Sequence, residues 1–190
     1  MELSNEFELR QKTCWPFKQK VQQVMKSSLK SPLTGIIHAD EFVVGGPEEG
    51  KKGRSKGAKK LIVLALEIVE DGVGRAYAEV IENSSAKELG SFLRKYVSKD
   101  AELITDKWKG YTPLKKEFLK LKQVASEDGK NFKELHIHIM NIKGWLRGIH
   151  HHCSKEHMQG YLNEYHFRYN RRSNMGTIFD VLMKKMVFLE

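Results

Sequence analysis

The sequence has 190 residues, 40% of them hydrophobic, which is enough for one well-filled core. Its 33 Lys and Arg residues outnumber its 24 Asp and Glu residues, and the formal charge of +9 favours a polyanionic partner such as nucleic acid. With only two cysteines and no apolar run longer than Leu61–Leu66, the composition argues against a disulfide-stabilised secreted protein and a membrane-spanning one. We therefore expect a soluble, cytoplasmic protein with one main domain.

The periodicity of the apolar residues predicts helices and strands in a defined order. The expected elements are a helix over Glu6–Ser28, strands over Ile36–Val44, Leu61–Val69 and Gly74–Ile81, a helix over Ser84–Tyr96, a strand over Glu102–Thr105, a helix with an apolar stripe at Leu135, Ile139, Ile142, Leu146 and Ile149, and helices over Ser154–Tyr169 and Thr177–Leu189. Three strands, a helix, a fourth strand and then helices is the order of an RNase H-like mixed sheet flanked by helices. Order alone also fits other α/β sheets.

A glycine-rich, charged stretch over residues 45–57 joins the first two predicted strands and is too polar to pack. It and the residues that follow carry a group of basic side chains, Arg54, Lys56, Lys59 and Lys60. One interpretation is a solvated hairpin tip. The interpretation that we prefer is a basic clamp on DNA phosphates, because it agrees with the net charge of the chain.

Two aspartates follow apolar strand segments. Asp40 comes after Ile36–Ala39, and Asp106 comes after Leu103–Thr105. If these strands are neighbours, the two carboxylates can share Mg²⁺, which keeps several waters and also binds substrate phosphates. Such a site supports phosphodiester chemistry. Aspartates at strand ends are also common turn formers, so position alone does not decide between the two roles.

Four segments in sequence order resemble the ISXO-like transposase domain of bacterial insertion-sequence DDE-type transposases. They are His38–Gly46, Thr105–Tyr111, Asn141–His151 and His157–Arg172. The resemblance extends over roughly residues 35 to 175 and implies an enzyme that cleaves and rejoins DNA with Mg²⁺ or Mn²⁺. It implies that Asp40 and Asp106 are the first two metal ligands.

The third ligand of this family is an acidic residue, or in some branches His or Asn, seven residues before a lysine that approaches DNA. Lys143 matches that lysine, so the third position falls on His136. Seven residues are almost two helical turns, which places His136 and Lys143 on one face and leaves Glu134, the nearest acid, on another. Asn141 is the alternative third residue. A surface histidine with no role is the alternative for His136, and imidazole suits Mn²⁺ better than Mg²⁺.

Further residues are candidates for DNA contacts. Arg147 and His150 continue the polar stripe of His136 and Lys143, and His151 occupies a position where the family also has His. Basic residues near the end of the resemblance can bind phosphate or can be an ordinary solvated helix end; they are Arg168, Arg171 and Arg172. Trp108 and Tyr111 can stack on an unpaired base or lie buried under the loop. The run His150–Cys153 does not have the spacing of a zinc site.

Members of the family usually carry a zinc ribbon and a helix-turn-helix ahead of the catalytic domain, and this sequence shows neither in full. We therefore expect residues 1–34 to be a leading helix left from a DNA-binding region, and residues 35–190 to be the catalytic domain of a truncated copy. Three functions fit this organisation: a transposase, a noncatalytic DNA-binding remnant, and a metal-dependent nuclease of the same fold. The sequence leaves open a homodimer in the DNA complex.

Overall fold

A computed structural model describes residues 2–28, 30–45, 59–150 and 153–188 of the chain. The described residues form two compact units. One lies within Ser28–Gln159, and the other joins residues of Met1–Ser27 with residues of Gly160–Glu190. The sequence-based division into residues 1–34 and 35–190 concerns function rather than compactness, and it stays a prediction.

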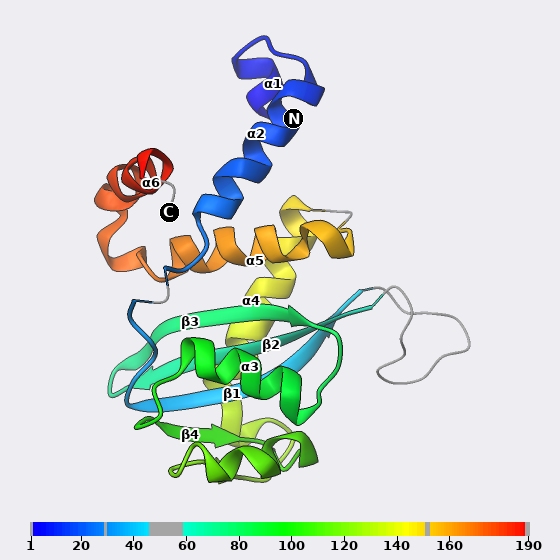
Figure 1. Cartoon of the computed structure of the whole chain (residues 1–190). Coiled ribbons are helices and arrows are strands. Elements are labelled where there is room, and N and C mark those ends of the chain that lie inside the picture. Colours follow the sequence, from blue (N-terminus) through cyan, green and yellow to red (C-terminus); the bar gives the residue numbers. More distant parts are fainter. Residues whose placement is uncertain (1, 29, 46–58, 151–152, 189–190) are drawn as a thin grey trace, which may run out of the picture. The chain divides into compact units, whose positions relative to one another are not determined.

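The first unit is built on a five-stranded mixed sheet (Figure 1). Its strands are β1 (Ile36–Val44), β2 (Lys60–Val69), β3 (Gly72–Ile81), β4 (Glu102–Thr105) and β5 (Lys122–Gln123). The order across the sheet is β3-β2-β1-β4-β5, with antiparallel pairs among the first three strands and parallel pairs from β1 to β4 and from β4 to β5. This is the RNase H-like arrangement that the sequence predicts.

Helix α3 (Ala86–Tyr96) covers one face of the sheet and helix α4 (Lys133–Ile149) covers the other (Figure 1). Side chains alternate between the two faces of a strand, so odd-numbered residues of β1 such as Ile37 and Ala39 join the core under α3. Ser85 is the N-cap residue of α3, and its side chain accepts a hydrogen bond from the backbone N–H of Glu88 at 3.5 Å. Its buried stripe is Leu89, Phe92, Leu93 and Tyr96.

The apolar stripe predicted for α4 is largely confirmed. Leu135, Ile139, Ile142 and Leu146 are buried, whereas Ile149 is 57% exposed because it lies at the last residue of the helix. The prediction that Ile149 packs on the sheet is wrong. His138 takes a place in the buried stripe instead.

The second unit consists of helices. It contains α1 (Glu2–Glu6), α2 (Gln11–Val24), most of α5 (Lys155–Tyr169) and α6 (Ile178–Val187). The predicted helix over Glu6–Ser28 is shorter at both ends in the structure, where α2 spans Gln11–Val24. Ahead of it the chain leaves α1 after Glu6, and Glu8 adopts a left-handed backbone at φ 51°. The remaining described elements are 3₁₀ helices. The first unit contains η1 (Lys109–Lys116) and η2 (Lys130–Phe132), and the second contains η3 (Arg172–Thr177). None of the described helices is long and apolar enough to cross a membrane.

The segment that leads into β1 is held by hydrogen bonds to Glu67 of β2 and Arg75 of β3, a pair that we call the anchor. The Glu67 carboxylate accepts hydrogen bonds from the Arg75 side chain at 2.9 Å and from the backbone N–H of Thr34 at 3.1 Å. Arg75 in turn donates to the backbone carbonyls of Ser31 and Pro32. Burial by itself raises the pKa of Glu67, but the hydrogen bonds from Arg75 and Thr34 and the charge of Arg75 together outweigh it and hold that pKa below its ordinary value of 4.5.

We predict that Glu67→Gln lowers the free energy of unfolding by about 2 kcal/mol at neutral pH, because a charge-assisted anchor is lost. A carboxyl whose pKa is lowered by folding contributes stability above its unfolded pKa, and the contribution disappears as the pH falls through the folded value. The difference between parent and variant in urea unfolding should therefore shrink below about pH 4.

The exposed ion pair between Glu82 and Lys155 provides the control. Glu82→Gln should change the free energy of unfolding by less than about 0.5 kcal/mol. A Glu67→Gln variant as stable as Glu82→Gln at neutral pH would show that the anchor does not stabilise the fold.

Candidate active site

Asp40 lies at the point of β1 where its pairing with β4 has ended. On one side β1 stays paired with β2 from Ile36 to Val44, and Asp40 is opposite Leu64. On the other side β4 pairs with β1 only up to the match of Ala39 with Thr105. Asp40 therefore stands at the first position of β1 beyond the end of β4.

Asp106 is the residue that follows the end of β4, so the same register brings it beside Asp40. One of its carboxylate oxygens, Oδ1, accepts a hydrogen bond from the backbone N–H of Trp108 at 3.0 Å. The side chain of Gln123, from β5, donates to the backbone carbonyl of Asp106 at 3.3 Å and to that of Trp108 at 2.9 Å. These bonds hold the start of the loop after β4, and with it the carboxylate.

Even-numbered residues of β1 meet α4 and the turn before it in a regular series. The His38 ring lies edge-on to Phe132 with 5.3 Å between ring centroids, the Nε2 of His136 is 3.9 Å from Oδ2 of Asp40, and the Nζ of Lys143 is 5.6 Å from the centroid of Phe42. Four residues of strand rise about 13 Å and eleven residues of helix rise about 16 Å, so α4 runs along β1 in the same direction. His136 and Lys143 thus face the strand that carries Asp40.

The position of His136 depends on Gly129. Gly129 has a left-handed φ of 88°, and a Cβ added there would lie 2.7 Å from Nδ1 of His136. The imidazole therefore packs its Nδ1 edge on the glycine backbone while Nε2 points toward Asp40. At 3.9 Å this contact is longer than a hydrogen bond, and the His136 side chain is 42% exposed.

Behind the aspartates, on the α3 side of β1, Glu41 and Tyr111 form a buried pair. The Tyr111 hydroxyl donates to Oε2 of Glu41 at 2.9 Å, and both side chains are buried. Burial raises the pKa of Tyr111 well above its ordinary value, and the charges of Glu41, Asp40 and Asp106 add to the effect. Glu41 thus points to the face of β1 opposite Asp40, and complete burial excludes Tyr111 as a base-stacking residue.

The donor atoms of Asp40 and His136 have a spacing that would suit two ligands of one divalent ion. Two ligands of an ion with bonds of about 2.1 Å lie between about 3 Å and about 4.2 Å apart, and the 3.9 Å between His136 and Asp40 falls in this range. No set of three His, Cys, Asp or Glu side chains within the described ranges is arranged to hold a metal by itself. Asp40, Asp106 and His136 would therefore hold such an ion only in an open site that water and phosphate complete.

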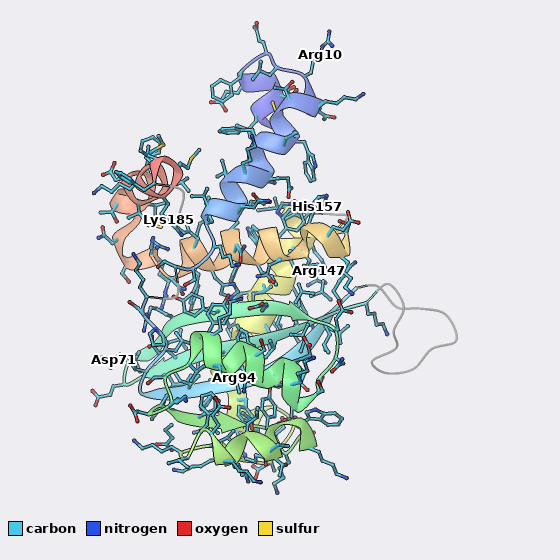
Figure 2. The ribbon with its side chains drawn as sticks, viewed as in Figure 1. Arg10, Asp71, Arg94, Arg147, His157 and Lys185 are labelled. Atoms are coloured by element: carbon cyan, nitrogen blue, oxygen red, sulfur yellow. The ribbon has the colours of Figure 1, made fainter. Side chains whose placement is uncertain are left out.

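The other predicted DNA contacts in this unit lie on two elements. Lys59 and Lys60 are half-buried at the start of β2, and Arg147 is exposed in the last turn of α4, one helical turn beyond Lys143 (Figure 2). Asn141, the alternative third residue, is exposed on α4. Arg54, Lys56 and His151 lie outside the described residues, so nothing tests their predicted roles.

The predicted basic group at the end of the resemblance belongs to the second unit. Arg168 lies 3.9 Å from Glu164, one turn earlier on α5. Arg171 stacks on the ring of Phe167 and donates to its backbone carbonyl, and Arg172 does the same with Tyr169. Their guanidinium groups therefore have intrachain contacts, and a role in DNA binding stays a prediction.

Sequence reasoning missed three features of the site. His38 faces α4 two residues before Asp40; burial lowers its pKa, and its buried Nδ1 has no hydrogen-bond partner in the described part of the chain. Gly129 and the tie from Gln123 were also missed. The even spacing of His38, Asp40 and Phe42 on a strand is the one signal that could have identified His38.

An RNase H-like sheet with two carboxylates at the free edge of its central strand defines the class of this protein. Residues 32–170 match the profile of the ISXO2-like transposase domain, and the chain belongs to that family. It therefore carries a transposase domain. Among solved structures, the "Mos1 transposase paired-end complex with left transposon end" is similar, with a TM-score of 0.30 and 13% identity over 97% of this chain and 73% of that one. The comparison with curated proteins found no match.

We predict that Gly129→Ala displaces the His136 ring from Asp40, because the added methyl group would overlap Nδ1. Gly35 is the matched control, since it has a similar left-handed φ of 75° and no atom lies within 4 Å of a Cβ added there. Both variants should lose roughly 1 kcal/mol of unfolding free energy from backbone strain. Only Gly129→Ala should shift the ring signals of His136 in an NMR spectrum. Unchanged His136 signals in a folded Gly129→Ala variant would contradict this account.

Proposed function

We propose that this domain cleaves and rejoins DNA phosphodiesters in the transposition of an insertion sequence, and that Asp40 and Asp106 bind the Mg²⁺ or Mn²⁺ on which the reaction depends. The observation that carries the proposal is the pairing of Ala39 with Thr105, because it makes Asp40 and Asp106 neighbours at the open end of β4. A divalent ion bound there would activate the attacking hydroxyl group and stabilise the leaving oxygen.

The residues around the aspartates have separate roles in this proposal. Asp40 and Asp106 supply carboxylate oxygens, and His136 supplies one imidazole nitrogen as the third ligand. Lys143 supplies a positive charge on the same helix face for a DNA phosphate. The buried Glu41–Tyr111 pair holds β1 against the loop after β4 and so maintains the separation of the two aspartates.

DNA is the partner that the family membership and the charge of +9 support. We assign phosphate contacts to the basic residues predicted from the sequence, namely Arg54, Lys56, Lys59, Lys60, Arg147, His151, Arg168, Arg171 and Arg172. Contacts of this kind bind the backbone and carry no sequence preference. A homodimer in the DNA complex stays a prediction.

A second candidate function is DNA binding without catalysis. One observation favours it: no three-residue metal group occurs in the segments that the structure describes. The resemblance adds that His136 stands at a position where the family usually has an acidic residue. A nuclease of the same fold is distinguished from both by its product.

We predict that the parent protein joins a DNA strand with a free 3′-hydroxyl to a target duplex, and that Asp40→Asn and Asp106→Asn each reduce joining below detection. The amide keeps the size of the side chain but removes its charge, which a divalent ion requires. Joining supports the transposase, hydrolysis without joining supports the nuclease, and binding alone supports the noncatalytic protein.

The same assay tests His136 through its choice of metal. The parent should work better with Mn²⁺ than with Mg²⁺, and His136→Glu should move the preference toward Mg²⁺ because it restores an all-oxygen site. Glu134→Gln is the matched control on α4 and should leave activity and metal preference unchanged. If His136→Ala joins DNA as well as the parent with either metal, His136 is not a ligand and Asn141 is tested next.

A further inference from the structure

Trp108 presents a large aromatic surface to solvent two residues after Asp106. Its side chain is 43% exposed, whereas Tyr111 in the same segment is completely buried. The residue is nevertheless held on three sides. Its indole N–H donates to the Ser84 carbonyl at 2.8 Å, its backbone N–H donates to Asp106, and its backbone carbonyl accepts from Gln123.

The Trp108 indole packs against the backbone at Gly110, where no side chain would fit. A Cβ at this position would lie 2.5 Å from the Ser84 carbonyl oxygen and 2.7 Å from Nε1 of Trp108. The polar edge of the ring therefore rests against the backbone, and its hydrogen-bonding capacity is used inside the protein. What remains exposed is apolar ring surface in a fixed orientation.

Several lysines lie close to Trp108 in the sequence. Lys107 and Lys109 are exposed on either side of Trp108 in sequence, and neither has an ion pair with another described residue. Lys115 and Lys116 are exposed in the last turn of η1. An exposed aromatic ring with lysines nearby in the chain offers the groups by which proteins bind single-stranded nucleic acid, because bases stack on the ring and phosphates contact the cations.

We propose that Trp108 stacks on an unpaired DNA base next to the strand held at Asp40 and Asp106, with Lys107 and Lys109 contacting the adjacent phosphates. The ligand is a single-stranded segment flanking a duplex, and the contact with Asp106 through the Trp108 backbone sets how close the stacked base lies to the aspartates. This inference deepens the proposed function and rests on it for the identity of the strand as a reaction substrate.

The test compares a blunt DNA duplex with the same duplex carrying a short single-stranded overhang, without added metal so that the DNA stays intact. We expect the parent to bind the tailed duplex more tightly, and Trp108→Ala to weaken that binding by about 5- to 100-fold while leaving the blunt duplex unaffected. Trp108→Phe should recover part of the preference because it keeps an aromatic face. Leu119→Ala, which changes another exposed apolar side chain nearby in sequence, should have no effect.

A fluorescent base, 2-aminopurine, placed in turn at each overhang position provides a readout of stacking itself. The parent should quench it at one position, and Trp108→Ala should abolish that quenching. Equal affinity of parent and Trp108→Ala for tailed DNA, or a loss that also affects the blunt duplex, would overturn the inference. The joining assay separates the two proposals: Trp108-dependent tail binding without joining sinks the proposed function alone, and joining without Trp108-dependent tail binding sinks this inference alone.

Discussion

The parallel pairing of β4 with β1 is the constraint on which the candidate site depends. β4 has only four residues, and its last pair joins Thr105 to Ala39. The backbone hydrogen bonds of β1 are therefore satisfied by β2 along its whole length but by β4 only up to Ala39. A shift of this register by one residue would send either aspartate to the other face of the sheet, because side chains alternate along a strand. The ties from Gln123 and from the Trp108 N–H fix the chain immediately beyond this point.

The two faces of β1 serve different purposes. Under α3, the odd-numbered residues Ile37 and Ala39 are core, and Glu41 ends the series in its hydrogen bond with Tyr111. A buried carboxylate next to two further carboxylates is costly unless it is hydrogen-bonded, and the neutral phenol provides that bond. Toward α4, the even-numbered residues meet a histidine and a lysine. The face of β1 toward α3 therefore stabilises the fold, and the face toward α4 carries the candidate site.

Much of the sheet could be predicted from the sequence because its strands are apolar and separated by clear turns. The bounds of β1 and β4 agree with the prediction. The sequence also showed that each of these strands leads into an aspartate, which would bring the two carboxylates together if the strands were neighbours. The two-residue strand β5 and the 3₁₀ helix η1 have no periodicity to detect, so the segment that holds Asp106 in place was missed. The break after Glu6 was also missed, because the apolar spacing continues through it.

The contacts of His136 show where sequence reasoning reaches its limit. A spacing of seven residues correctly places His136 and Lys143 on one helix face, but it does not show that the face meets β1 or that Gly129 makes room for the ring. Those facts depend on how α4 packs across the sheet, which local periodicity does not encode. Local periodicity also does not show that Trp108 is exposed and Tyr111 buried, because this depends on the hydrogen bonds of the loop after β4.

Divalent-ion binding by the protein with a DNA strand bound is the most direct test of the central claim, that Asp40 and Asp106 share a metal site. Binding of Mn²⁺ can be followed by the electron paramagnetic resonance signal of the free ion, with Glu134→Gln as the control. The account predicts that the parent and the control remove Mn²⁺ from solution, and that Asp40→Asn and Asp106→Asn each weaken this binding by at least about tenfold. Equal Mn²⁺ binding by the parent and both Asn variants, all folded and bound to DNA, would contradict it.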